Sequence, residues 1–423
     1  MRRAPIPELA VALGLRGVLV LGSWLAASGA RAETPGGRPV TFAAARAAGE
    51  VAAPDVTVAA RRDAVTRAQL GVAGALANPT LGLTTARQTA RLGASVSVPL
   101  PLFGQRGAAV AAARSDADVA ALDVEAARAE GRFAASFAWL DLWEAEGRAR
   151  LFAQAAADAE RVAAIADEKF KAGSAPRVDV LRTAADRARA RADSAFAAAS
   201  VPAAAARLAI AMGDPTTDRL SAEGAPDIEL GQPLADLMRL LPVHPAARRD
   251  RARVEAAAAH VRAEQRLRWP TINAELAVNW HDPTLPATDL IGGVAFEAPV
   301  LSLRGGAIAR AKAEQSLAET SAELELRRLD ADLADAYARA EGAGARARSL
   351  ATDVLPALEE VRRMTEEGYR DGRVDLLRLI DAERARLDSR LAQVEAQAAW
   401  QRALAEVERA VGAPLDRRGA DGR

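Results

Sequence analysis

The sequence repeats itself, and this duplication limits how the 423-residue chain can fold. Forty residues separate Gly173 from Gly213, and forty separate Gly372 from Gly412. The second glycine of each pair lies in closely similar sequence, AMGDP in the first half and AVGAP in the second. The fold therefore has to contain one unit of about 190 to 200 residues twice.

The amino terminus has the features of a secretory signal peptide. Arg2 and Arg3 give a positive start, an apolar stretch spans 17–28, and Ala-Arg-Ala at 30–32 fits a cleavage site. Its removal takes four arginines and one glutamate from a neutral chain and leaves a net charge of −3. The predicted organisation is a signal peptide at 1–32, a first repeat at 33–215, a second repeat at 216–415 and a disordered tail at 416–423.

Composition excludes several classes of protein. The chain has no cysteine, so disulfides, thiolate metal sites and cysteine nucleophiles are excluded. Basic and acidic side chains number 56 each and the pI is near 6.9, which argues against a nucleic-acid partner because such a partner needs a basic surface. Aromatic residues make up only 4%, whereas alanine is abundant, and this favours long helices that pack closely.

Long helices are predicted in each repeat. No proline occurs from 102 to 175, so one helix of roughly 70 residues fits there, about 105 Å long. Apolar residues within 326–340 follow the 3, 4 spacing of a coiled coil in the second repeat. Each long helix ends at a glycine, Gly173 or Gly372, where the chain is expected to fold back. The predicted helical hairpins are 102–212 and 300–412.

Two prolines conflict with unbroken helices in this arrangement. Pro356 is expected to bend or break the long helix of the second repeat, because it removes a backbone donor and its ring clashes with the preceding turn. Pro202 lies in the return helix of the first repeat, and the sequence offers no account of it.

Each repeat also contains two segments in which apolar and polar residues alternate. Within 272–280, Ile272, Leu276 and Val278 share one side, whereas Asn273 takes the other. About nine residues per strand is the length that crosses a bilayer at a tilt. The predicted strand pairs are about 80–99 and about 271–298.

Four strands are too few to close a barrel. In hydrocarbon, an open sheet edge leaves unpaired amides that cost several kcal/mol each. If the strands are embedded in a membrane, several copies must therefore pool them, and the protein must be an oligomer. A water-soluble hairpin with one solvated side is the alternative that alternation alone leaves open.

The order of these features resembles that of the outer-membrane efflux proteins of the TolC type. The resemblance lies in ANPTL at 77–81, VPLPLFGQRG at 98–107 and GYRDGRVDLLRLIDAERARL at 368–387. With LPALEE at 355–360, the last segment is most similar to the branch that serves heavy-metal and cation exporters. The resemblance covers essentially the whole chain after residue 32.

The resemblance implies a fold and a function. The fold class is mainly α with a small β part: long antiparallel helical hairpins form an α-barrel, and four transmembrane strands per chain contribute to the twelve-stranded β-barrel of a homotrimer. The implied function is a passive exit duct in the outer membrane for cations, heavy metals or small toxic compounds, with its helical part in the periplasm. The implied partners are outer-membrane lipid, a periplasmic adaptor protein and an inner-membrane pump of the RND type. No enzymatic activity, catalytic residue, cofactor or resident metal ion is expected.

The resemblance also places a gate at the second hairpin tip, near Asp371, Asp375 and Arg378. Three copies of Asp375 would form an acidic ring that attracts cations, whereas capping of the returning helix is the alternative role. Because relatives often carry a second acid where Arg378 lies, a pairing of Asp375 with Arg378 that holds the tip shut is a further expectation. Asp179 is expected to cap the corresponding helix of the first repeat. Adaptor-docking positions are expected at both tips: Gly173, Val178, Leu181, Gly372, Val374 and Leu377.

Other chemistry and other classes of function have weaker support. His244, His260 and His281 are far apart in the sequence, so no metal site is expected from them. The outer-membrane component of a type I protein secretion system is an alternative function. A periplasmic coiled-coil adaptor or scaffold is another, but an adaptor would place one hairpin between the halves of a β-rich domain, and a scaffold would lack the strand pairs.

Overall fold

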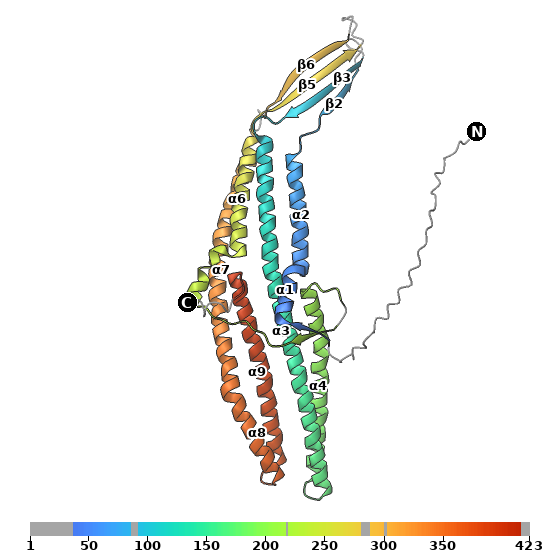
Figure 1. Cartoon of the computed structure of the whole chain (residues 1–423), viewed down its shortest axis with the longest axis vertical. Coiled ribbons are helices and arrows are strands. Elements are labelled where there is room, and N and C mark those ends of the chain that lie inside the picture. The colour runs from blue at the N-terminus through green and yellow to red at the C-terminus, as the bar shows by residue number, and fades with distance from the viewer. Residues whose placement is uncertain (1–36, 86–91, 217–218, 281–287, 300–302, 416–423) are drawn as a thin grey trace, which may run out of the picture. The chain divides into compact units, whose positions relative to one another are not determined.

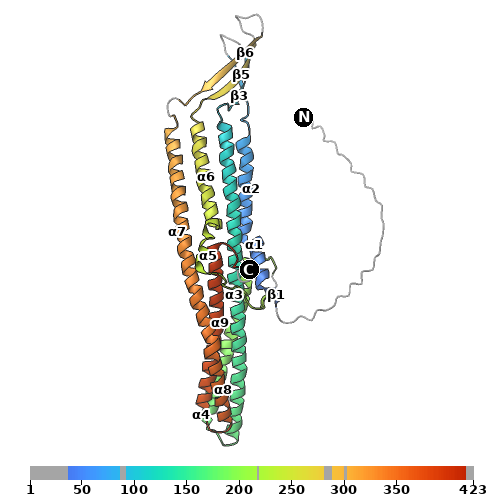
Figure 2. The ribbon, with the colours of Figure 1, turned by 60° about the vertical axis from the view of Figure 1, so that its left-hand side comes forward.

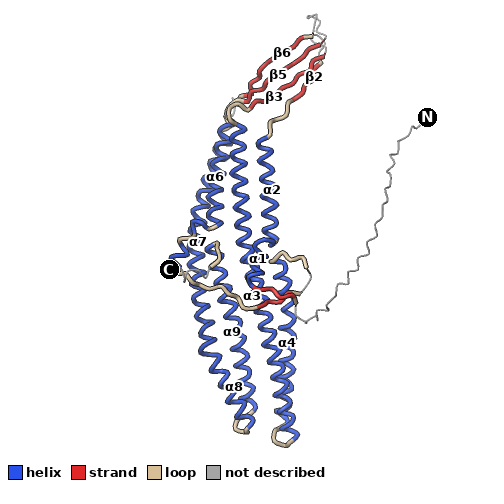
Figure 3. The backbone as a smooth tube through the Cα atoms, viewed as in Figure 1, coloured by secondary structure: helices blue, strands red, loops and turns tan. Residues whose placement is uncertain are grey.

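The computed structural model describes residues 37–85, 92–216, 219–280, 288–299 and 303–415, which belong to one compact unit, Gly36–Arg423. Helices make up most of this unit, with one four-stranded sheet at an end and a two-stranded sheet near the middle (Figure 1, Figure 3). The predicted signal peptide, the predicted tail and the turn of the first strand pair lie outside the described residues, and the repeat boundaries stay a prediction.

The long helix predicted for the first repeat is confirmed as α3 (Gln105–Lys171), which continues for 67 residues. The return helix α4 (Arg177–Ala211) packs along it, as both views show (Figure 1, Figure 2). Ala197, Ala204 and Leu208 are among the buried residues of α4. Small alanine side chains on the contact face let the two backbones approach closely, so a chain with few aromatic residues can still form a packed interface.

Pro202 lies inside α4 without ending it. Proline cannot donate a hydrogen bond to the carbonyl of Ala198, four residues earlier. Both Pro202 and Ala198 are exposed, so water can satisfy that carbonyl and the proline ring clashes with no neighbouring helix.

The second repeat has the expected interruption. Its long helix consists of α7 (Gly305–Ser349), a π-helical segment η2 (Leu350–Val354) and α8 (Leu355–Arg370), and α9 (Leu376–Val411) packs against α7 and α8. Pro356 lies in the first turn of α8, directly after η2. The prediction that Pro356 disturbs this helix is confirmed, and the disturbance takes the form of one wide turn and not a break.

The π-helical segment also corrects the spacing of the face that packs on α9. Buried and half-buried residues of this face follow steps of 3 and 4 on both sides of η2, but the step from Leu350 to Leu355 is 5. The wide turn accommodates the additional residue, so the same side of the helix stays turned to α9. The residues of this face are Leu333, Ala336, Ala340, Ala343, Ala347 and Leu350, then Leu355, Leu358, Arg362, Thr365 and Tyr369.

A shorter helix precedes each strand pair: α2 (Pro54–Gly74) and α6 (Pro245–Arg266). Each begins with a proline in its first turn, where the missing N–H leaves no hydrogen bond unmade. Near the sheet the helices neighbour one another in the order α2, α3, α6, α7 (Figure 2). In the other half the order is α4, α3, α9, α8 (Figure 1).

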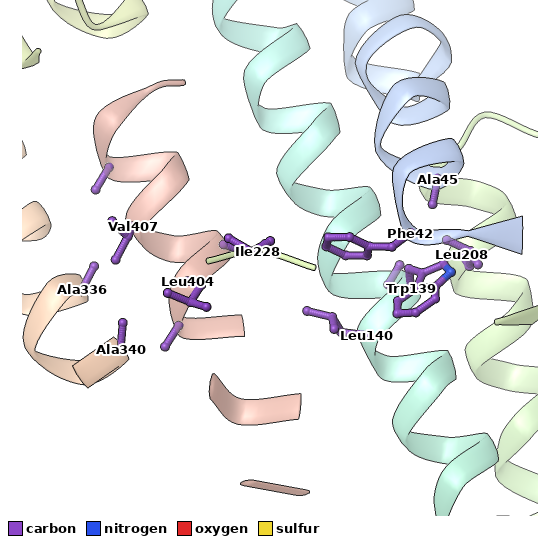
Figure 4. Packing of buried hydrophobic residues seen from close by; sticks show 14 of the residues in the cluster. Phe42, Ala45, Trp139, Leu140, Leu208, Ile228, Ala336, Ala340, Leu404 and Val407 are labelled. Atoms are coloured by element: carbon purple, nitrogen blue, oxygen red, sulfur yellow. The ribbon is translucent and has the colours of Figure 1, made fainter. Parts of the chain in front are cut away.

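The middle of the unit contains short elements that the sequence analysis did not predict. They contribute to one hydrophobic core that also contains the fully buried Trp139 (Figure 4). Trp139 donates from Nε1 to the backbone oxygen of Val40 at 2.7 Å. The Phe42 ring contacts the Trp139 ring edge-on, with centroids 5.1 Å apart. The short elements are β1 (Arg38–Thr41), α1 (Phe42–Ala52), β4 (Leu220–Glu223), α5 (Leu234–Met238) and a 3-10 turn η1 (Leu241–Val243).

The four-stranded sheet has the order β2 (Thr80–Thr84), β3 (Leu92–Leu100), β5 (Thr271–Trp280), β6 (Asp289–Glu297), and all its pairs are antiparallel. The β3–β5 pair joins the two repeats. Three strands have the predicted length, but β2 has five residues, so the expectation of about nine was wrong there. Thr80 pairs with Ser97, which places Pro79 opposite Val98, and proline has no N–H to continue the ladder.

Candidate functional site

One face of the four-stranded sheet is apolar and uncovered. The strand register aligns Leu276 with Val96 on one side and with Gly292 on the other, so the apolar positions of neighbouring strands meet. Leu81 is 79% exposed and Phe296 is 68% exposed. Within the described residues no helix covers this face, and an exposed apolar surface of this kind marks contact with a membrane or a partner. The face consists of Leu81, Leu83, Leu92, Ala94, Val96, Val98, Leu100, Ile272, Ala274, Leu276, Val278, Trp280, Leu290, Val294 and Phe296.

The opposite face is polar and acidic. It carries three carboxylates, Glu275, Asp289 and Glu297, and the described residues of the four strands of this sheet include no lysine or arginine. Ser97 donates to Glu275 across the β3–β5 pair at 3.5 Å. Ile291 is the large apolar exception on this face. A sheet with one apolar and one hydrophilic face has the pattern of a membrane barrel wall around an aqueous interior.

The two outer strands each have a neighbour on one side only. β2 pairs only with β3, and β6 pairs only with β5, among the residues that the structure describes. Unpaired N–H and C=O groups along such edges are costly in hydrocarbon. The two edge strands of the isolated sheet therefore have a strong tendency to pair with further strands.

The first hairpin tip is a glycine-ended turn between α3 and α4. Gly173 has φ +72°, a left-handed conformation that favours glycine, and its N–H bonds the oxygen of Phe170 at 2.9 Å. Ser174 N–H bonds the oxygen of Lys169 at 2.9 Å and completes the helix end. Val178 and Leu181 follow in the first turns of α4 with exposed side chains.

The second tip repeats this geometry. Gly372 has φ +74° and bonds the oxygen of Tyr369, and Arg373 N–H bonds the oxygen of Gly368 at 2.8 Å. Val374 packs against Gly368, where any Cβ would lie 2.6 Å from a Val374 methyl group. Leu377 is exposed at the start of α9. The two tips therefore present apolar side chains beside a tight backbone turn.

Asp375 begins α9 as its N-cap: its Oδ1 accepts a hydrogen bond from the backbone N–H of Arg378 at 3.0 Å. Asp375 and Arg378 therefore meet through the backbone, and among the described residues no ion pair joins their side chains. Asp371 forms an ion pair with Arg373 across the turn. The capping role of Asp375 is present in the single chain, whereas the gate role of Asp371, Asp375 and Arg378 stays a prediction.

The expectation that Asp179 caps α4 was wrong. The N-cap is Pro176, which has no side chain that can accept a hydrogen bond, and Asp179 lies in the first helical turn. There its negative charge interacts favourably with the positive end of the helix dipole, without a capping hydrogen bond. Asp381, an exposed acid one turn after Arg378, was not predicted from the sequence. Its spacing from Arg378 on a helix face was the available signal.

Lys169 and Tyr369 connect the two tips within one chain. Lys169 Nζ donates to the backbone oxygen of Tyr369 at 3.1 Å and lies 3.8 Å from the centre of its ring. Burial raises the pKa of Tyr369, and the negative charge of Asp179 adds to this effect. The hairpins thus touch near their ends through a cation–π contact.

Further from the tips, Arg386 of α9 connects the two hairpins through ion pairs. Its side chain is 12% exposed and forms ion pairs with Asp158 of α3 at 3.5 Å and Glu359 of α8 at 3.0 Å. Burial alone would raise the pKa of Glu359, but the hydrogen bonds and charges of Arg386 and Arg390 outweigh it and lower that pKa below its ordinary value. Glu359 is therefore held ionised between two helices.

The described residues contain no group of three or more His, Asp or Glu side chains that could hold a metal ion. His244 caps α6 through Nδ1, which accepts from Ala246 N–H at 3.0 Å, and His260 contacts Asp116 at 2.9 Å. His281 lies outside the described residues. Among the described helices, α4 alone has the length and mean hydropathy of a membrane span, a feature that the sequence analysis did not recognise. It packs along α3, however, as one arm of a hairpin.

This combination of an amphipathic sheet and paired helical hairpins defines a class of outer-membrane protein. A family model described as "Outer membrane efflux protein" matches residues 50–214 and 239–413. The chain belongs to this family. It is an outer-membrane efflux protein with its helical part in the periplasm, and the family consists of channel proteins.

Individual relatives agree with this assignment. The chain is 23% identical over 378 residues to the cobalt-zinc-cadmium resistance protein CzcC of Cupriavidus metallidurans, covering 88% of this chain and 90% of that protein. The crystal structure of CusC, a transmembrane channel, superposes with a TM-score of 0.73 at 16% identity, covering 88% of this chain and 92% of CusC. A membrane protein from Pseudomonas aeruginosa superposes with a TM-score of 0.75 at 18% identity, covering 89% and 92%. The resemblance stated from the sequence is confirmed, and an adaptor or scaffold is not supported.

Proposed function

We propose that the protein is the exit duct of a tripartite efflux system and works as a homotrimer that carries cations or heavy-metal ions across the outer membrane. The observation that carries this proposal is the amphipathic sheet with two unpaired edges, because it can satisfy its amides in lipid only by closing with other copies.

The two edges of the unit are different from each other, which favours closure into a ring. β2 lies at one edge of the sheet and β6 at the other, so a head-to-tail contact repeats until the ring closes. The helices can also meet head to tail, because two different helices, α2 and α7, lie at opposite ends of the helix order. Exposed apolar residues with heptad spacing lie on both of these outer helices: Val58, Val65 and Val72 on α2, and Leu317 and Leu324 on α7.

Three copies fit the function better than two. Two copies would close eight strands, and the interior of an eight-stranded barrel is filled by side chains or holds one small ligand. Three copies give twelve strands and leave room for an aqueous passage. This number also agrees with the family resemblance.

The hairpin tips suit docking to a periplasmic adaptor, with an inner-membrane pump of the RND type beyond it. Val178, Leu181 and Leu377 are exposed apolar residues at the tips and have no cover from the described residues of this chain. The acidic face of the sheet supports cations as the transported class, as does the name of the relative that confers cobalt, zinc and cadmium resistance. The duct itself supplies no energy for transport.

Cysteine cross-linking tests the ring. Because the sequence has no native cysteine, every disulfide must come from the introduced residues. Val65→Cys on α2 and Leu317→Cys on α7, introduced together, should form disulfides between copies under oxidation in isolated outer membranes. We expect a denaturing gel to show bands that end at three subunits. Each single variant is the control and should give no band above two subunits.

Function is tested by reconstitution into planar bilayers and by metal sensitivity. We expect cation-selective channels from the purified protein, and loss of cobalt, zinc or cadmium tolerance when the gene is deleted. A ladder that ends at two subunits, or a protein that is a water-soluble monomer without detergent, would contradict the proposal.

A further inference from the structure

A basic and aromatic pocket lies where the sheet meets the helices. It has a volume of about 560 Å³ and lies between the start of α3 and the end of α6. It lies next to the end of the sheet that is nearer the helices, where β3 ends at Leu100 and β5 begins at Thr271. The residues that give the pocket its character are Leu102, Phe103, Ala108, Arg262, Arg266 and Trp269.

The pocket carries positive charge that nothing in the described residues neutralises. Arg262 and Arg266 lie one turn apart on α6, both exposed, and neither forms an ion pair within the described part of the chain. Earlier on the same helix, Arg248 and Arg253 are paired with acids of α3. No aspartate or glutamate is among the described residues that line the pocket. The site therefore suits an anion.

The wall beside these arginines is suited to the membrane interface. The rings of Phe103 and Trp269 stack with centroids 5.6 Å apart, and Trp269 is half exposed. Gln105 Nε2 donates to the backbone oxygen of Pro270 at 3.2 Å and fixes the chain next to Trp269. Aromatic rings with nearby cations are typical of the boundary between hydrocarbon and headgroups.

The pocket opens on the convex side of the helix layer. A different hollow, of about 440 Å³, is lined by α2, α3, α6 and α7 together, and includes Gln69, His260 and Glu314. Because α2 and α7 are the outer members of the helix order, the face that all four share is concave. Arg262 is two residues from His260, which is roughly 200° around an α-helix, so it points to the opposite, convex side.

We propose that this pocket binds the phosphate of an anionic phospholipid headgroup in the periplasmic leaflet of the outer membrane. Arg262 and Arg266 contact the phosphate, while Leu102 and the Phe103–Trp269 pair lie against the start of the acyl chains. The proposal rests on the membrane position of the sheet and is independent of what the duct exports. A bound lipid would hold the junction between the barrel and the helices at the level of the lipid headgroups.

Native mass spectrometry of the full-length protein in detergent tests this binding. The probes are phosphatidylglycerol and phosphatidylcholine, each titrated separately, with inorganic phosphate as a soluble competitor. We expect at least fivefold tighter binding of phosphatidylglycerol. Because each arginine near a headgroup contributes about a fivefold gain, the double variant Arg262→Gln/Arg266→Gln should lose most of this preference.

Arg251→Gln is the matched control, since Arg251 is an exposed arginine of α6 outside the pocket, and it should bind phosphatidylglycerol as the unaltered protein does. Circular dichroism should show unchanged helix content in all three proteins, because the substituted side chains are exposed. Equal binding of the two lipids, or equal binding by the double variant, would overturn the proposal. Displacement of phosphatidylglycerol by millimolar inorganic phosphate would show an unspecific anion site and overturn it as well. Channel conductance measured on the same variants reports separately on the proposed function.

Discussion

At the scale of single residues, the two hairpin tips show which features the sequence can predict. Gly173 and Gly372 were recognised because a left-handed helix end favours glycine, and both have φ above +70°. The capping role of Asp179 was predicted wrongly because Pro176 moves the helix start. Capping depends on where a helix begins to within one residue, and periodicity does not fix that position.

His244 gives the fold a dependence on pH. Burial lowers its pKa, and this outweighs the backbone oxygen of Arg409 and the charge of Glu325, which act in the opposite direction, while Arg249 adds to the lowering. The folded protein therefore binds fewer protons at His244 than the unfolded chain does, so this contribution to stability is complete above the ordinary histidine pKa of 6.5 and declines as pH falls below it. Protonation also removes the Nδ1 lone pair that caps α6. We expect a lower Tm at pH 5.5 than at pH 7.5 in thermal melts followed by circular dichroism.

The variant His244→Asn separates this effect from other titrations. Asparagine is a good N-cap and does not titrate, so the variant should show a smaller drop in Tm over the same pH range. The same drop in both proteins would show that other groups cause it.

Arg378 is predicted to restrict ion passage at the tip. Its side chain is exposed and lies on the first turn of α9, between the cap Asp375 and the acid Asp381. Three copies near an opening would repel cations. Arg378→Gln should therefore raise single-channel conductance in planar bilayers, whereas Arg346→Gln, on an exposed face of α7 away from the tip, should not. Unchanged conductance in Arg378→Gln would remove this residue from the gate.

At the scale of elements, strong periodicity decided what could be predicted. The 67-residue helix α3 and the three longer strands follow from patterns that continue over many residues. The middle elements did not, because β1 and β4 have four residues each and pair in parallel across 182 positions of sequence. The shortness of β2 depends on what lies opposite Pro79, which only the register reveals.

The π-helical segment leads to a test by deletion. Deleting Thr352 reduces the step between Leu350 and Leu355 from 5 to 4, which an ordinary α-helix provides. Combined with Pro356→Ala, the deletion should leave the face that packs on α9 intact and change Tm by no more than about 2 °C, which corresponds to roughly 1 kcal/mol in a chain of this size. Thermal melts and the amount of assembled protein in outer membranes give the measurement.

Deletion of Ala338 is the control for that experiment. It removes one residue from a regular part of α7 and turns everything beyond it by about 100° relative to α9. Loss of assembled protein is expected. If both deletions are tolerated equally, η2 does not set the register between α8 and α9.

At the scale of the whole molecule, the sheet determines how the chain meets its surroundings. Sequence alternation identified its two faces, and the register confirms that the apolar positions of all four strands coincide. The pairing of β3 with β5, which unites the repeats in one sheet, was beyond sequence reasoning because the pattern does not name the partner of a strand.

Glu275 is predicted to favour cations in the barrel interior. It lies in the middle of the acidic face, opposite Ser97 and Gly293. Glu275→Gln should lower the ratio of cation to anion permeability by about twofold, since it removes a fixed charge from a confined aqueous space. Reversal potentials in a salt gradient measure this ratio. Glu275→Asp keeps the charge and should keep the ratio, and equal loss in both variants would point to a change of shape.

The two halves of the duplicated chain have become mechanically unequal. The first hairpin is built on an uninterrupted helix, whereas the second contains the wide turn η2 between its attachment and its tip. Long helices kink preferentially at wide turns of this kind. The first hairpin is therefore expected to be the stiffer of the two. Under load, elastic bending should concentrate in the second hairpin, at η2.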